Sequence, residues 1–488
     1  MPRRKLIHLS LRDKKTRYKS RPALRGTPLR IKYAQFLIFF SLILLFCLAK
    51  NSYAQNGPSL IRDAETEKFL HELADPIFRA ANLDPNNIHI YIVGDDSLNA
   101  FVSGGQNVFI NTGLLQKYKT PDTLIGVIAH ETGHITSGHL ARSGEAGDQA
   151  QGAMLLSYLL GIGAVVAGSP DAGMALIAGG SSTAERLYAK FTRTQEEAAD
   201  NHAVEYLDKL AYPADGLVDL LEFFETEMIG YKGQVDEYLL SHPVSRKRID
   251  LIKARTASKK FSDKKINQKL QRRMDMVLAK LEAFIANPDA ILLTYPNQND
   301  ELSNYKKSIA LFHKGKISES MALLDPIIAV AGRESSEKGF LLEMKGQILF
   351  ESGDIENSIL AYSQAIKLLS AKDASQAKIS FASGILALKK NDKELIGLAI
   401  KRLEEAKIFE DESPFLFKQL ASGYSKIGDE GRSLLALAEF NLMIGKKDKC
   451  KKYAKSAKEK LDKTAKLELL RADDLLELAQ EDEKKKKE

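Results

Sequence analysis

Cysteine is nearly absent from this chain, which contains two cysteines, Cys47 and Cys450, among 488 residues. Cys47 lies in an N-terminal segment that we expect to be removed. A mature chain with Cys450 alone cannot form an internal disulfide, so its fold does not depend on an oxidising compartment. Hydrophobic residues make up 44% and charged residues 28% of the chain, which is typical of soluble globular protein. The length predicts two or more domains.

Acidic residues are almost missing from residues 1–54, which hold thirteen Lys and Arg against one acid, Asp13. This segment carries a net charge of +12, so the other 434 residues sum to −5 although the whole chain is +7. The basic balance therefore belongs to the N-terminus. The folded body gives no indication of a nucleic-acid surface, and we expect no nucleic-acid partner.

Long apolar runs are also scarce, and the clearest one, Phe36–Ala49, has fourteen residues without a charge. As a helix it would cover about 21 Å of a hydrocarbon core about 30 Å thick. A basic stretch that ends at Lys32 precedes it, and the small residues Ser52 and Ala54 follow it. This order predicts a secretory signal peptide over residues 1–54, cleaved after Ala54. An uncleaved N-terminal anchor is the alternative.

Residues 55–290 show a mixed pattern that predicts an α+β domain. The apolar, β-branched and aromatic positions alternate with period two in some segments and recur with helical period in others. We expect strands at Ile88–Gly94 and Asn107–Gly113, and helices at Ala64–Leu83, Pro121–Ser143 and 184–209.

Residues 291–475 carry helical signal almost throughout, interrupted by regularly spaced turns. The turn pairs are 38, 38 and 37 residues apart, at Gly315-Lys316, Gly353-Asp354, Asn391-Asp392 and Gly428-Asp429. A fixed period with a helix–turn–helix unit predicts an all-α solenoid similar to tetratricopeptide repeats, with small residues Gly346 and Ala361 at close-packing positions. A plain helical bundle is the alternative. Residues 476–488 are predicted to be a disordered charged tail.

Residues 127–139, VIAHETGHITSGH, contain the residues that point to chemistry. His130 and His134 are four apart, so on a helix they face one direction and can both bind one Zn²⁺. Glu131 lies about 100° further round, beside the metal without being a ligand, as a general base requires. The alternative is a helix without a metal, whose histidines are exposed or hydrogen-bonded in a core.

A third ligand has to come from elsewhere in the chain. His139 would lie on the opposite side of a regular helix from His130, so we assign it to packing or hydrogen bonding. Glu196 and Asp200 are four residues apart and share a helix face, whereas Glu197 is rotated about 100° away. One of the first pair should ligate, and the other should accept a ring N–H from a ligating histidine.

Three motifs in this order resemble the gluzincin family of HtpX-like and Oma-like zinc endopeptidases. They are His130-Glu131-Thr132-Gly133-His134, Glu196-x-x-Ala199-Asp200, and HPVSRKRI from His242 to Ile249. The segment Asn99–Leu115 also looks like the one that precedes the metal helix in that family, and the resemblance covers roughly residues 60–255.

The resemblance implies a gluzincin-type metalloprotease domain with one zinc ion per chain. His130, His134 and Glu196 are then the ligands, and Asp200 accepts a ring N–H from a ligating histidine. Glu131 is the catalytic base. His242, in its His-Pro context, can reach the open position of the metal or support the oxyanion.

Export together with a repeat domain implies, within this family, a periplasmic endopeptidase. Such an enzyme cleaves misfolded or stalled outer-membrane proteins, and its repeats recruit substrate or assembly machinery. The HtpX branch carries several membrane helices, and this chain shows no such set after residue 54. The alternative function is a periplasmic chaperone or scaffold in which proteolysis is secondary.

Two further segments are expected to lie near the active site. The strand around Gln106–Ile110 is expected to be an edge that pairs with an extended substrate backbone, with an ordinary core strand as the alternative. Residues 153–180 are apolar and too short to span a bilayer twice. We favour a hairpin packed near the active site there, over peripheral membrane contact.

Overall fold

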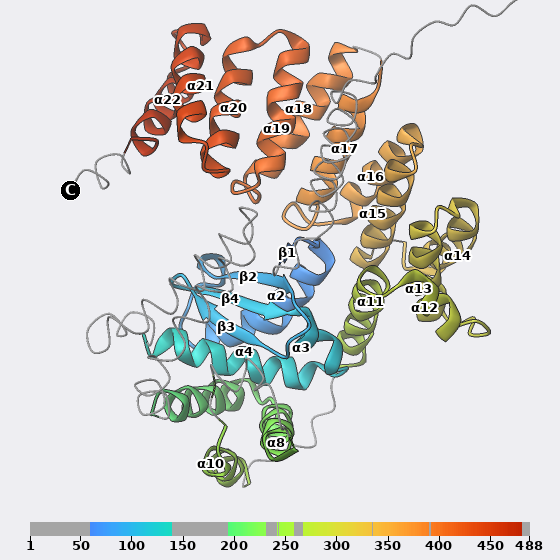
Figure 1. The fold of residues 1–488 in the computed structure, drawn as a ribbon, viewed down its shortest axis with the longest axis vertical. Coiled ribbons are helices and arrows are strands. Elements are labelled where there is room, and N and C mark those ends of the chain that lie inside the picture. Colours follow the sequence, from blue (N-terminus) through green and yellow to red (C-terminus); the bar gives the residue numbers. More distant parts are fainter. Residues whose placement is uncertain are drawn as a thin grey trace, which may run out of the picture.

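Figure 1 presents the fold of a computed structural model of the chain. The structure describes residues 59–138, 194–230, 242, 244–257, 267–333, 335–389 and 392–480. The predictions for residues 1–54, His139 and 153–180 fall outside these residues. The described part is mostly helical with one small sheet, in agreement with the α+β prediction.

The sheet has four strands in the order β1-β2-β4-β3. Their bounds are β1 Ser59–Ile61, β2 His89–Gly94, β3 Ala100–Ser103 and β4 Asn107–Asn111. β2 and β4 are the two predicted strands, and they pair in parallel, whereas β1 and β3 pair antiparallel with their neighbours. The sequence did not reveal β1 and β3, because three or four residues are too few to establish an alternating pattern.

The expectation that the segment around Gln106–Ile110 forms an edge is wrong. β4 pairs with β2 on one side and with β3 on the other, so it is an inner strand of the described sheet. The edge next to helix α4 (Pro121–Thr136) is β3. On the face away from the core, Phe101, Phe109 and Tyr91 form a stack across β3, β4 and β2, with ring centroids 4.9 and 5.1 Å apart.

Helices α2 (Ala64–Ala80) and α4 cover the other face of the sheet, as Figure 1 shows. Asp63 caps α2 by accepting a hydrogen bond from the Thr66 N–H, and α4 starts at Pro121. The helix predicted for Pro121–Ser143 ends earlier than expected, at Thr136. Gly138 follows with a φ of +61°, a left-handed conformation that ends helices and suits glycine.

Further helices complete the first domain around α4. The predicted helix at 184–209 is present over the described residues 194–210. α8 packs along α4, and two glycines allow this: a Cβ at Gly126 or Gly216 would lie under 3 Å from Leu217 or Asp122. The other bounds are α3 Thr112–Lys117, α8 Asp215–Gly230, α10 Arg246–Thr256 and η2 Pro85–Asn87.

An array of helices follows, in which α11 and α12 both pack on α13 and each later helix packs on the next. Their bounds are α11 Gln268–Ile285, α12 Pro288–Thr294, α13 Glu301–His313, α14 Ile317–Val330, α15 Ser336–Glu351, α16 Ile355–Leu368, α17 Ser375–Ala387, α18 Lys393–Lys407, α19 Pro414–Ile427, α20 Glu430–Met443, α21 Lys447–Lys460 and α22 Lys466–Leu478. All four predicted turn pairs lie between two helices of this array. Gly346 is a close-packing position as predicted, because a Cβ there would lie 2.8 Å from the Tyr362 ring.

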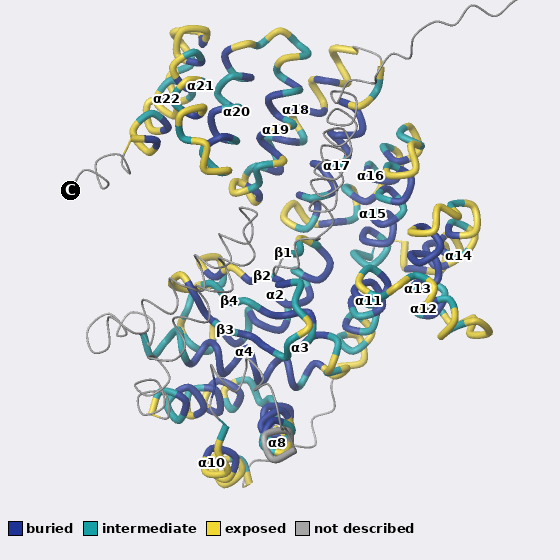
Figure 2. Tube along the Cα trace, viewed as in Figure 1, coloured by how far each residue is buried: buried dark blue, intermediate teal, exposed yellow. Residues whose placement is uncertain are grey.

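Helix α11 belongs to two cores at once. Met274 and Leu281 pack into the core under the sheet, whereas Met276 and Ala283 pack into the first core of the array. Figure 2 shows α11 largely buried between the two parts of the molecule. The passage from one part to the other is thus a shared helix, close to the boundary predicted near residue 290.

A second, polar contact joins the array to the first domain. Arg62 lies 2.9 Å from Glu410, Lys68 pairs with Asp373, and the Tyr91 hydroxyl donates to Glu412 over 3.5 Å. Among the described residues, no helix combines the length and the apolar character that a membrane span requires.

Candidate metal centre

Helix α4 presents the two histidines of the HETGH motif on its buried face. His130 is fully buried, and its Nε2 atom lies 3.1 Å from Nε2 of His134, one turn further along. This separation is the helical i, i+4 arrangement that the sequence predicts. Glu131 is buried beside them and is 1% exposed.

The helix at residues 194–210 crosses α4 directly at the motif. A Cβ at Gly133 would lie 2.6 Å from the carbonyl oxygen of Ala199, so only glycine permits this approach of the two backbones. The approach brings Glu196 to the histidines. Its Oε2 lies 3.3 Å from Nε2 of His130, and its Oε1 lies 3.3 Å from Nε2 of His134.

His242, which precedes α10, completes a group of four. Its Nδ1 lies 3.4 Å from Nε2 of His130 and 3.3 Å from both carboxylate oxygens of Glu196. The four candidate ligand atoms of His130, His134, Glu196 and His242 all lie within 4.8 Å of one another.

Several of these spacings are close to those between the ligand atoms of one zinc ion. Ligand atoms placed about 2.0–2.1 Å from one ion at tetrahedral corners lie about 3.3–3.4 Å apart. One or the other oxygen of Glu196 lies 3.3 Å from a nitrogen of each histidine, and His130 lies 3.1 Å from His134 and 3.4 Å from His242. Three imidazole nitrogens and one carboxylate are also a donor set that suits zinc. The residues present therefore fit this metal.

Glu131 stands next to this quartet and is not part of it. Its Oε1 lies 3.4 Å from Nε2 of His242, the ring atom opposite the one that faces the quartet. Burial raises the pKa of the Glu131 carboxyl above its usual range. A raised carboxyl pKa is what a proton-accepting group that works near neutral pH needs.

Asp200 lies behind His130, with its Oδ1 3.0 Å from Nδ1 of the ring. Burial opposes a charge on His130, but the contacts with Asp200 and Glu196 outweigh it and raise its pKa to about 10. The two carboxylates thus favour positive charge at the His130 position. Glu197 points away from the site, is about one-third exposed, and pairs with Lys247 at 2.6 Å.

Arg248 is a member of the site that sequence reasoning missed. Its side chain is 2% exposed, and its guanidinium donates to Asp200 over 2.7 and 2.9 Å and lies 2.9 Å from Glu196. This guanidinium helps hold the pKa values of both carboxyls below their usual range, against the opposing effect of burial. One signal was available: Arg248 is four residues before Ile252, on the buried face of α10.

Removing Arg248 should cost far more stability than removing its neighbour. In metal-free protein, Arg248→Met should lower the free energy of unfolding by about 3–5 kcal/mol, because two buried carboxylates lose their cation. Lys247→Met is the matched control. Lys247 is 68% exposed, and its loss should cost about 1 kcal/mol or less. Urea denaturation in chelator measures both, and equal losses would show that Arg248 does not hold the carboxylates.

Comparison with known proteins identifies the same region. Residues 61–256 match the model of peptidase family M48. The chain is 27% identical over 281 residues to a beta-barrel assembly-enhancing protease of Yersinia pestis, a match that covers 55% of this chain and 56% of the relative. It is 28% identical over 192 residues to the Escherichia coli K12 protein of the same name, which covers 39% of each.

A third relative is shorter. Metalloprotease YcaL of Escherichia coli K12 is 28% identical over 197 residues, 40% of this chain and 71% of that protein. The chain spans about half the length, or less, of the assembly-enhancing proteases it matches. The matched segment contains all four members of the quartet together with Glu131, Asp200 and Arg248. Residues 61–256, which contain the candidate metal centre, are thus similar to the peptidases of family M48.

Proposed function

We propose that the chain is a zinc-dependent endopeptidase of the cell envelope that cleaves misfolded or stalled outer-membrane proteins. The observation that carries the proposal is the quartet of candidate ligand atoms, which lie within 4.8 Å of one another. His130, His134 and Glu196 would hold the zinc ion, and Asp200 orients His130 through Nδ1. Bound zinc would supply Lewis-acid chemistry, activating water and polarising the peptide carbonyl.

Glu131 performs the proton transfers of peptide hydrolysis. Its buried carboxylate accepts a proton from the attacking water and passes it to the leaving amine. The substrate backbone runs along β3, the described edge strand that adjoins α4, in place of the inner strand expected from the sequence. An extended peptide can add to such an edge through main-chain hydrogen bonds.

His242 holds the resting enzyme inactive. Its Nδ1 occupies the fourth corner of the quartet, and its Nε2 lies 3.4 Å from the carboxylate of Glu131. In this position the His242 ring takes the place of the attacking water. Its Nε2 atom also contacts the Glu131 carboxylate, which is then not available to a water molecule. A protease that works among unfolded proteins benefits from such a latch, which opens when the histidine swings away. Swung away, the ring can donate to the developing oxyanion.

Removing the latch should activate the resting enzyme. If the competent state is populated at about 0.1–10%, His242→Ala should raise cleavage of a short peptide by about 10- to 1000-fold, with metal retained. A fall in rate would show that oxyanion support outweighs latency. His202→Ala, at a histidine of the 194–210 helix whose side chain is 40% exposed, is the control. Unchanged rates on a peptide and on a full-length protein would remove His242 from both roles.

The helical array recruits substrate or assembly partners as a TPR-like solenoid. The regular turn spacing supports this assignment, as does the name of the relatives, which refers to β-barrel assembly. Because β-barrel assembly takes place at the outer membrane, the same name supports a periplasmic location, with residues 1–54 directing export. Because the metal quartet and Glu131 are intact, the peptidase is favoured over a chaperone or scaffold without proteolysis.

A cleavage assay with and without chelator tests the proposal. Casein and a misfolded porin should both be cut by the metal-loaded chain, and the chelator should abolish the cleavage. Added zinc should restore it. Binding of the porin without any cleavage, in protein whose metal content is one per chain, would favour the scaffold function.

A further inference from the structure

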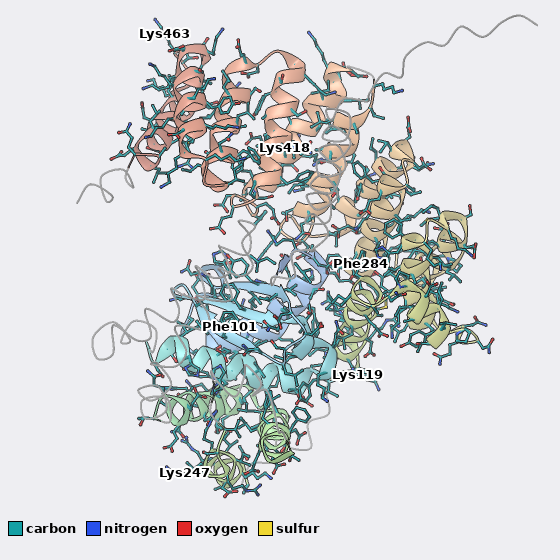
Figure 3. The ribbon with its side chains drawn as sticks, in the orientation of Figure 1. Phe101, Lys119, Lys247, Phe284, Lys418 and Lys463 are labelled. Atoms are coloured by element: carbon teal, nitrogen blue, oxygen red, sulfur yellow. The ribbon has the colours of Figure 1, made fainter. Side chains whose placement is uncertain are left out.

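The far end of the helical array carries a concentration of positive charge that the peptidase chemistry does not use. Residues 446–466 hold ten lysines and three acids, a net charge of +7, although the chain after residue 54 sums to −5. This segment comprises α21, the turn after it and the first residue of α22. Figure 3 shows Lys463 at the outer end of the array, far from Lys247 on α10.

The lysines of α21 lie on its solvent side. The helix buries Cys450, Ala454 and Ala457, which face α20 and α22. Lys449, Lys452 and Lys455 succeed each other at intervals of three on the opposite, exposed side, along about 9 Å of the axis. We call these three residues the lysine ridge. Figure 2 shows the outer side of α21 and α22 as largely exposed.

The ridge is not neutralised by neighbouring acids. Lys458 and Lys460 pair with Asp473 and Glu430. No ion pair of the three ridge lysines occurs within residues 392–480, which the structure describes without a gap. A row of exposed ammonium groups without protein partners is complementary to a row of anions.

Apolar side chains accompany the lysines at the turn into α22. Leu467, directly after Lys466, is 79% exposed, and Leu470, one helical turn after Lys466, is 60% exposed. Lysines together with exposed leucines are the pattern of a surface that binds at a lipid interface, where lysines contact headgroups and leucines reach the acyl boundary. A single-stranded nucleic acid would require a stacking platform, and the segment has one aromatic residue, the half-buried Tyr453.

We propose that the tip formed by α21 and the start of α22 binds the surface of an anionic lipid bilayer. The lysine ridge supplies the electrostatic attraction, and Leu467 and Leu470 supply the apolar contact. This contact would hold the end of the array on the membrane, and the metal centre would stand at the other end of the molecule.

Lysine footprinting tests the proposal on the full chain. An acylating reagent is applied with vesicles of phosphatidylcholine alone, or with phosphatidylglycerol added to about 30%, and modification is read by mass spectrometry. The ridge should become several-fold protected only on the anionic vesicles, and less so in high salt, since screening weakens such contacts. Lys393, Lys401 and Lys418, exposed on α18 and α19, are internal controls that should remain reactive. Residues 1–54 carry +12 and can also bind anionic lipid, so protection of the ridge is judged against the control lysines of the same chain.

Two triple variants give the matched comparison. Lys449→Gln with Lys452→Gln and Lys455→Gln should weaken attachment of the array tip about 100-fold, at about fivefold per lysine. The same change at Lys393, Lys401 and Lys418 should have little effect, although it removes equal charge.

Four results would overturn the proposal. They are equal protection on neutral vesicles, equal protection of the control lysines, protection by soluble glycerol phosphate, and protection by polyglutamate or RNA without any by anionic vesicles. The last of these would assign the ridge to an acidic polymer.

Discussion

Glu131→Gln should abolish most peptide hydrolysis and leave the metal in place. Glutamine keeps the size of a side chain that is 1% exposed, so packing is undisturbed. It cannot accept the proton of the attacking water, and loss of general-base catalysis costs about 10²- to 10⁴-fold in rate. Turnover of a quenched peptide, measured beside metal content, gives both quantities from one preparation.

The control for this variant is the same chemical change at an exposed glutamate. Glu197→Gln removes a carboxylate that pairs with Lys247 and points away from the quartet. It should cleave at the wild-type rate. If Glu131→Gln instead loses its metal, Glu131 is a ligand, and the assignment of the base fails.

The geometry around the HETGH motif was largely predictable because helical spacing determines it. An i, i+4 pair faces one direction wherever the helix lies, so His130 and His134 could be placed before the fold was known. The same argument separated Glu196 and Asp200 from Glu197. It could not decide which acid faces the metal, because that depends on where the 194–210 helix crosses α4, at Gly133 and Ala199.

The parts that the sequence did not predict depend on contacts between distant segments. β1 and β3 have three and four residues, and their pairing with inner strands determined that β3 is the edge near α4. Arg248 is the last of three consecutive basic residues after Ser245, and the other two, Arg246 and Lys247, are exposed. Its spacing from Ile252 indicates a buried face, but its contacts with Glu196 and Asp200 depend on where α10 lies, which no local pattern contains. The early end of α4 depends on Gly138, a helix terminator that lies inside an otherwise helical pattern.

Glu196→Ala should remove the metal almost completely, and Glu197→Ala should not. The Glu196 carboxylate lies 3.3 Å from three imidazole nitrogens and is 2% exposed, so its loss leaves an incomplete donor set. Alanine at 197 removes one partly exposed ion pair, worth about 1 kcal/mol or less. Equilibrium dialysis against buffered zinc should therefore show a loss well above 100-fold for the first variant and almost none for the second.

Asp200→Asn should fall between these two variants. The residue touches His130 at Nδ1 and is not one of the four ligand atoms, and such supporting changes typically cost about 10–100-fold in affinity or activity. Asparagine also loses the charge that Arg248 pairs with, so part of the effect should appear as lower stability in chelator. If Glu196 and Asp200 share the helix face toward the metal, the loss of zinc affinity should be largest for the Glu196 variant, smaller for the Asp200 variant and smallest for the Glu197 variant. Equal losses at 196 and 197 would contradict it, and a loss at 200 as large as at 196 would make Asp200 a direct ligand.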